Sequence, residues 1–164
     1  GNLGIMFPMI TSVSEVQKVL EICKTVREEL QAEQIPYAEK MELGIMIETP
    51  AAAIISDQLA PLVDFFSVGT NDLTESTLAC DRQNPDIESF CDTHHEAILR
   101  LIAWSAKNAH EHGAWIGICG ELAADTSLTE RFLRMGIDEL SVSPTFVLKV
   151  RDAVRKVDLR TKEN

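Results

Sequence analysis

Gly69-Thr70-Asn71-Asp72-Leu73-Thr74 is the stretch of sequence that decides the fold of this chain. It follows a predicted strand, Val63 to Val68, and places an amide and a carboxylate where that strand ends. The upstream stretch Gly44-Ile45-Met46-Ile47-Glu48-Thr49-Pro50 repeats the arrangement, because Glu48 follows another apolar strand. In α/β folds the carboxyl ends of parallel strands carry ligands and catalytic groups. The two stretches therefore predict an α/β fold with a site at one edge of its sheet.

Strands and helices alternate along the chain, as such a fold requires. The sequence predicts strands over residues 3–9, 42–47, 63–68, 115–119 and 139–142. It predicts helices over residues 12–34, 49–60, 72–78, 94–112, 127–135 and 143–157, with an irregular loop over 81–92. A complete (β/α)₈ barrel needs ~250 residues. Five βα units in 164 residues therefore predict either an open doubly wound sheet or part of a barrel.

Several side chains predict where helices begin and end. Ser12-x-x-Glu15 is a capping box at the start of the first helix. Thr49 and Pro50 suit an N-cap and a first helical position. Thr93 is the predicted cap of the long helix, and Gly113 its C-terminal stop.

Composition limits the class of protein. The 164 residues are 45% hydrophobic, so they can form one domain with a real core, expected over about residues 3–157. The net charge of −11 argues against nucleic-acid binding, because such a surface repels phosphate backbones. The sequence contains no apolar run of membrane-spanning length and no signal peptide. The chain opens on Gly1 almost inside a strand, which indicates a fragment of a longer protein.

The four cysteines are Cys23, Cys80, Cys91 and Cys119, and no two of them have C-x-x-C spacing. This spacing argues against a zinc site or a redox pair. Without a secretion signal, the sequence predicts reduced thiols and a cytoplasmic location.

Glu48 and Asp72 are the candidate metal ligands. Mg²⁺ is usually held by one or two carboxylates together with waters and substrate phosphates. The alternative is that each carboxylate only caps the helix that follows it. Because both follow strands and Asn71 adjoins one of them, the metal interpretation is favoured.

Asn71 and Arg82 are candidate anion-binding residues. The backbone N–H groups of the turn before a helix attract phosphate or carboxylate, and the stretch around Asn71 is such a turn. Arg82 lies in the loop after the same strand, and a guanidinium forks onto phosphate oxygens. A solvated surface arginine is the alternative.

Cys119 ends another predicted strand, between Gly117 and Gly120. Glycines let other atoms approach closely. An ordinary thiol near neutral pH mostly keeps its proton, so Cys119 could act as an acid toward carbon or as a nucleophile. From the residues alone, the interpretation of Cys119 as a small buried thiol that only packs is slightly favoured.

Four motifs in order resemble the C-terminal domain of enzyme I of the bacterial sugar phosphotransferase system. They are Ile47-Glu48-Thr49-Pro50, Gly69 to Thr74, Asp81-Arg82 and Cys119-Gly120-Glu121-Leu122-Ala123. The resemblance runs from about Ile5 to Val157. It implies a (β/α)₈ TIM barrel that binds phosphoenolpyruvate, of which these five units would be the C-terminal part.

The resemblance also implies roles for the candidate residues. Glu48 and Asp72 would bind Mg²⁺, and Asn71, Asp72 and Arg82 would bind the substrate. Cys119 would be the proton donor that converts the enolate to pyruvate. The phosphoryl group would pass to a histidine of the same enzyme and then to the carrier protein HPr.

The resemblance counts the five strands as the fourth to eighth of the barrel. The first three strands and the reactive histidine would lie upstream, so we expect this fragment alone to be inactive. We also expect unpaired edges at residues 3–9 and 139–142, and pairing with another chain, as in a homodimer. This chain departs from the family pattern at Glu75 and Ser76, where the family usually has glutamine and an aromatic residue, and at Cys80.

Two other functions compete with this interpretation. A metal-dependent aldolase or lyase of the pyruvate-barrel group would share the two carboxylate stretches but would lack the Cys-Gly-Glu strand end and the Asp-Arg element. A non-catalytic dimerisation module is the second alternative, and Glu75 and the truncation allow it.

Overall fold

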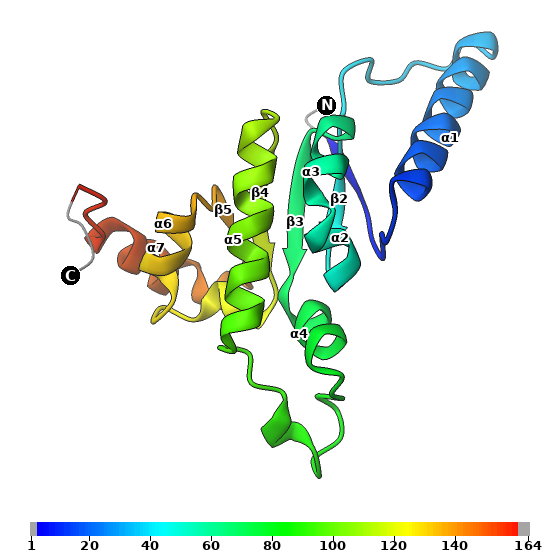
Figure 1. Cartoon of the computed structure of the whole chain (residues 1–164). Helices are drawn as coiled ribbons and strands as arrows, with labels where there is room; N and C mark the ends of the chain where they lie inside the picture. Colours follow the sequence, from blue (N-terminus) through cyan, green and yellow to red (C-terminus); the bar gives the residue numbers. More distant parts are fainter. Residues whose placement is uncertain (1–2, 161–164) are drawn as a thin grey trace.

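Five parallel strands form one sheet in which the spatial order is the order in the sequence, β1-β2-β3-β4-β5. The computed structural model describes residues 3–160 (Figure 1). The strands are β1 (Gly4–Phe7), β2 (Glu42–Ile47), β3 (Phe65–Gly69), β4 (Trp115–Cys119) and β5 (Glu139–Leu140). A doubly wound sheet reverses its strand order at a switch point, whereas a barrel does not. The sequential order therefore agrees with the predicted partial barrel.

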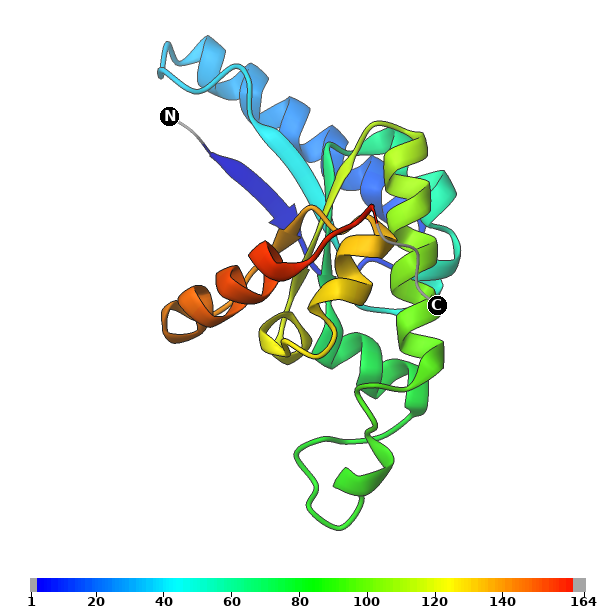
Figure 2. The same ribbon diagram turned by 90° about the vertical axis from the view of Figure 1, so that its left-hand side faces the viewer.

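Helices follow each strand. They are α1 (Val13–Ala32), α2 (Pro50–Ile54), α3 (Ser56–Leu59), α4 (Thr70–Leu78), α5 (Glu96–Glu111), α6 (Thr129–Met135) and α7 (Val147–Lys156). Short 3₁₀ helices are η1 (Ala60–Leu62), η2 (Glu88–Phe90), η3 (Glu121–Ala124) and η4 (Pro144–Phe146). Helices α2, α3 and α5 lie together over one face of the sheet, and the loop after α4 extends beyond its carboxyl edge (Figures 1 and 2). Within residues 3–160, no helix is both long and apolar enough to cross a membrane.

The central strands bury alternate side chains against the helices. The buried side chains on this face are Ile45, Ile47, Phe66, Val68, Ile116 and Ile118. Each contributes about 1.5–3 kcal/mol relative to an exposed position. On the opposite face, Phe65 stacks on Trp115 with ring centroids 4.5 Å apart. Because side chains alternate along a strand, Cys119 lies on the same face as Trp115.

Two of the predicted helix starts are confirmed. The Ser12 hydroxyl accepts a hydrogen bond from the Glu15 N–H, and the Glu15 carboxylate accepts one from the Ser12 N–H. The Thr49 hydroxyl caps α2 by accepting a bond from the Ala52 N–H, and Pro50 is the first helical residue. Such caps are worth about 1 kcal/mol each.

The predicted cap of α5 at Thr93 is wrong. The helix begins at Glu96, and the His95 ring accepts the hydrogen bond from the Ala97 N–H. His94 is bonded to Asp125 on another loop, with 2.7 Å between His94 Nε2 and Asp125 Oδ2. This contact holds the residues before His95 outside the helix.

The two predicted edges are confirmed, because β1 and β5 each have a strand neighbour on one side only within residues 3–160. Leu3, Ile5 and Met6 are exposed large apolar side chains on or next to β1. An edge of this kind is a template for pairing with further strands.

Candidate functional site

The candidate residues gather at the carboxyl edge of the central strands. Ile47 of β2 lies beside Val68 of β3, and Gly69 of β3 lies beside Cys119 of β4. Since the strands are parallel, the residues that follow them lie along one edge of the sheet.

Glu48 is a buried carboxylate with one oxygen left unpaired. Glu48 directly follows β2 in the sequence, and the residue is 4% exposed. Oε1 accepts a hydrogen bond of 2.6 Å from the Met9 N–H, and within residues 3–160 Oε2 accepts none. A Cβ on Gly69 would lie 3.2 Å from Oε2, so glycine leaves the space beside that oxygen open. A carboxylate oxygen without a donor, on a largely buried side chain, suits a hard cation.

Asp72 lies in the first turn of α4, which begins at Thr70, two residues before the predicted helix start at Asp72. Gly69 is the N-cap without a capping side chain, and the helix follows the strand directly. The Asp72 side chain is exposed and has no hydrogen-bond partner in the described part of the chain. Among those same residues, no group of three or more His, Cys, Asp or Glu side chains is arranged to hold a metal ion. Mg²⁺ is commonly held by only one or two carboxylates, with water and substrate phosphate completing the coordination.

Asn71 connects the start of α4 to the end of β4. Its Oδ1 accepts a hydrogen bond of 3.2 Å from the Glu121 N–H. The neighbouring Thr70 hydroxyl donates to the carbonyl of Cys119 at 3.1 Å. Gly120 has φ +101°, and a Cβ there would lie 2.5 Å from Thr70 Oγ1. Glycine at this position is therefore required for the close approach.

Cys119 is a partly exposed free thiol. Its Sγ donates a hydrogen bond to the Val68 carbonyl at 3.4 Å and accepts one from the Ser67 hydroxyl at 3.5 Å. It lines a hollow of about 490 Å³ together with Asn71 and Phe146. The sequence prediction did not include Ser67, although a lone hydroxyl inside an apolar strand was a signal that could have found it.

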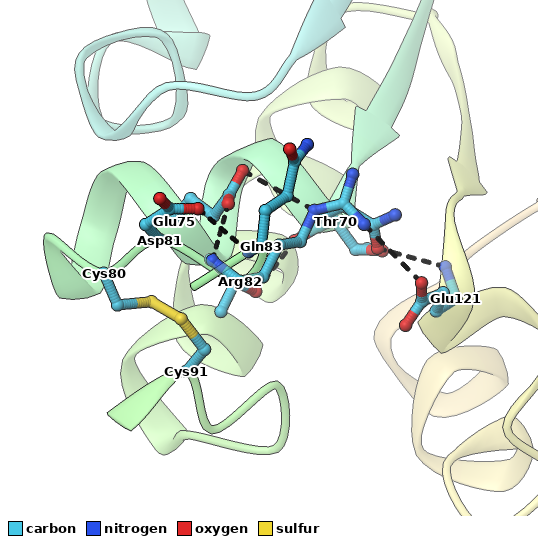
Figure 3. Close-up of polar contacts among 10 residues, drawn as sticks. Thr70, Glu75, Cys80, Asp81, Arg82, Gln83, Cys91 and Glu121 are labelled. Carbon is cyan, nitrogen blue, oxygen red and sulfur yellow. Dashed lines mark hydrogen bonds and ion pairs between the residues drawn. A yellow bond between two sulfur atoms is a disulfide. The ribbon is translucent and has the colours of Figure 1, made fainter. Parts of the chain in front are cut away.

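Arg82 lies between two carboxylates (Figure 3). Its Nε is 3.6 Å from Glu75 Oε2, and its Nη1 is 3.6 Å from Glu121 Oε1. Arg82 and Asn71 line a second hollow, of about 170 Å³. Asn71 therefore borders both hollows, with Arg82 in one and Cys119 in the other.

A disulfide closes the loop that carries Arg82, so the prediction of four reduced thiols is wrong. Cys80 and Cys91 are bonded across a sequence separation of 11, with their Cα atoms 5.7 Å apart (Figure 3). The loop folds back on itself and brings two distant cysteines within bonding range. Spacing rules that look for C-x-x-C do not detect such a pair. Cys23 and Cys119 are free.

A contact between His94 and Asp125 holds the C-terminal end of this loop. Asp125, which follows η3, faces His94 on one oxygen and Ser127 on the other. The hydrogen bond from the Ser127 hydroxyl, helped by that from His94, holds the pKa of the Asp125 carboxyl below its ordinary value.

Together, the sequential parallel sheet and the polar residues along its carboxyl edge define a (β/α)-barrel type of enzyme domain. The fold is similar to a citrate lyase of Burkholderia xenovorans, with a TM-score of 0.69 and 19% identity over 92% of this chain and 48% of that one. It is also similar to malate synthase of Haloferax volcanii, with a TM-score of 0.66 and 15% identity over 98% of this chain and 46% of the other. Identities this low show the fold alone. The predicted TIM-barrel fold class is thereby confirmed.

Residues 1–159 match the family described as PEP-utilising enzyme, PEP-binding domain, where PEP is phosphoenolpyruvate, and the chain belongs to this family. It is 44% identical over 163 residues to phosphoenolpyruvate-protein phosphotransferase of Lactococcus lactis subsp. cremoris, and 43% identical over 157 residues to that of Priestia megaterium. These alignments cover 99% and 96% of this chain but 28% and 27% of the relatives' length. The resemblance drawn from the four motifs is confirmed, and the aldolase alternative loses its support.

Proposed function

We propose that this chain is the phosphoenolpyruvate-binding part of a phosphoenolpyruvate–protein phosphotransferase, enzyme I of a sugar phosphotransferase system. The observation that carries the proposal is the position of Asn71, which borders one hollow with Arg82 and another with Cys119. A substrate at Asn71 would have a phosphate-binding group on one side and a proton donor on the other. The 44% identity to a named phosphotransferase supports the same function.

Arg82 and Asn71 bind the substrate phosphate. The guanidinium forks onto two phosphate oxygens, and the amide and backbone N–H groups at the start of α4 donate to others. Glu48 and Asp72 hold Mg²⁺, which when bound neutralises charge on the phosphate. The unpaired Glu48 Oε2 and the exposed Asp72 carboxylate support these two roles.

Cys119 supplies the proton that completes the reaction. The bond between the phosphorus and the enol oxygen breaks, and the phosphoryl group passes to a histidine outside this chain. The remaining enolate takes the thiol proton of Cys119 on its terminal carbon and becomes pyruvate, and water then reprotonates the thiolate. The Ser67 hydroxyl, which donates to Sγ, orients the thiol and stabilises the thiolate.

The partners follow from the same proposal. The histidine passes the phosphoryl group to HPr, and the protein acts in the cytoplasm as a homodimer in sugar uptake. This chain spans little more than a quarter of the length of its relatives. We therefore propose that it needs the rest of the enzyme for transfer, and that its open edges β1 and β5 pair with the remaining strands.

Glu48→Gln tests the proposal in the natural protein that contains this chain. The amide keeps an acceptor for the Met9 N–H but loses the charge that a cation needs. We expect phosphoenolpyruvate binding that requires Mg²⁺, and a Kd at least about tenfold higher in the variant, measured by calorimetry with Mg²⁺ and with a chelator. Glu42→Gln, at the other end of β2, is the matched control and should bind normally. Binding that is indifferent to both Mg²⁺ and Glu48→Gln would contradict the proposed site.

A further inference from the structure

Glu75 makes two different contacts with Arg82 from its position on α4 (Figure 3). Its Oε1 accepts a hydrogen bond of 2.8 Å from the Arg82 backbone N–H. Its Oε2 lies 3.6 Å from the Arg82 Nε. The Glu75 side chain is 25% exposed and that of Arg82 is 41% exposed, so the pair lies at the mouth of the site.

The two contacts depend on different properties of the carboxylate. The backbone contact needs only an oxygen acceptor, and it fixes residue 82 against α4. The guanidinium contact needs negative charge, because 3.6 Å is too long for a good hydrogen bond. Glu121 adds a second carboxylate on the other side of the guanidinium, with its side chain 74% exposed.

We propose that Glu75 is a positioning residue for Arg82 and that its charge also lowers the affinity of Arg82 for the substrate phosphate. The acceptor oxygen holds the arginine where the phosphate binds, while the negative charge competes with that phosphate for the guanidinium. The inference rests on the proposed function, because it takes Arg82 as the phosphate ligand. Glutamine at this position would keep the first effect without the second.

Glu75→Gln and Glu75→Ala separate the two effects. Both remove the charge, but only glutamine keeps an acceptor for the Arg82 N–H. In the natural protein that contains this chain, we expect glutamine to tighten phosphoenolpyruvate binding about two- to fivefold, as exposed ion pairs allow. We expect alanine to bind at least about fivefold more weakly than glutamine, because the loop loses its hydrogen-bond acceptor. The value of kcat should change by less than about twofold in both, since Cys119 is untouched.

Calorimetry with phosphoenolpyruvate and Mg²⁺ gives Kd, and steady-state pyruvate release gives KM and kcat. Glu21→Gln makes the same charge change in a surface ion pair on α1, and its Kd should equal that of the wild type. If the alanine variant does not fold, the near-isosteric glutamine variant still decides whether the charge competes. A wild type that binds with the same Kd as the glutamine variant would overturn the inference alone. A wild type that does not bind phosphoenolpyruvate would overturn the proposed function and the inference with it.

Discussion

The ends of the central strands and the loop that carries Arg82 are held in different ways. Glu48 and Cys119 bond to main-chain groups of neighbouring segments, through the Met9 N–H and the Val68 carbonyl. Arg82 is held by the carboxylate of Glu75 and by the disulfide that closes its loop. The strand ends are thus placed by the sheet, whereas the loop is placed by individual side chains.

This difference determines how each region responds to substitution. Main-chain partners persist when a side chain on the sheet is replaced. A substitution at a strand end therefore removes a reacting or metal-binding group but leaves the backbone in place. A substitution that removes a contact holding the loop instead displaces Arg82, even where the replaced residue does not touch the substrate. Effects on kcat and on binding or stability should therefore separate by region.

Cys119→Ala should give the largest effect, a loss of pyruvate release, and tests the region at the ends of the central strands. Without the proton donor we expect pyruvate release to fall by about 10²- to 10⁴-fold, while the Kd for phosphoenolpyruvate stays within about twofold. A coupled assay of pyruvate release measures the rate. Cys23→Ala removes the other free thiol, on α1, and should keep normal turnover. Wild-type turnover in Cys119→Ala would refute its assignment as the proton donor.

Removing the disulfide should give the next largest effect and test the loop side. The double variant Cys80→Ala/Cys91→Ala should lose about 2–3 kcal/mol of unfolding free energy, because the short closed loop no longer restricts the unfolded chain. Urea unfolding, without reductant, measures the difference. Under the same conditions the wild type should show two reactive thiols after unfolding, Cys23 and Cys119. Four reactive thiols would show that the disulfide does not form.

Asp125→Asn should give the smallest effect, at the other end of the loop. The pKa of Asp125 lies below its ordinary value of 3.8, mainly because the Ser127 hydroxyl donates to it. A lowered pKa contributes stability that is present above pH 3.8 and is lost as pH falls through the lower folded-state value. We expect the variant to lose less than about 1 kcal/mol near neutral pH, and less than it loses there when the pH is lowered below 3.8. Urea unfolding between pH 7 and pH 3 measures this, and an equal loss at every pH would contradict the explanation.

The sheet was largely predictable from the sequence. The strands Glu42–Ile47 and Trp115–Cys119 have the predicted bounds, because a buried strand is a short apolar run with polar or glycine residues at its ends. The start of α4 was less predictable. Gly69 offers no capping side chain, so nothing in the sequence marks Thr70, rather than Asp72, as the first helical residue.

The structure of the loop that carries Arg82 could not be predicted from the sequence. The bond between Cys80 and Cys91 and the contact between His94 and Asp125 both join residues that no local pattern connects. Each depends on how the loop folds back against the rest of the chain. The roles of Glu48, Asn71, Asp72, Arg82 and Cys119 stay predictions, which the substitutions above address.

The stack of Phe65 on Trp115 gives the protein an internal optical reporter. Trp115 begins β4 and Phe65 begins β3, so the indole lies at the opposite end of these strands from Cys119. The chain has two tryptophans, and Trp104 is 43% exposed on α5. With Trp104 replaced by phenylalanine, the fluorescence emission of Trp115 would report the separation of β3 from β4 during unfolding. It would respond little to ligand binding or substitutions at the carboxyl edge of the sheet.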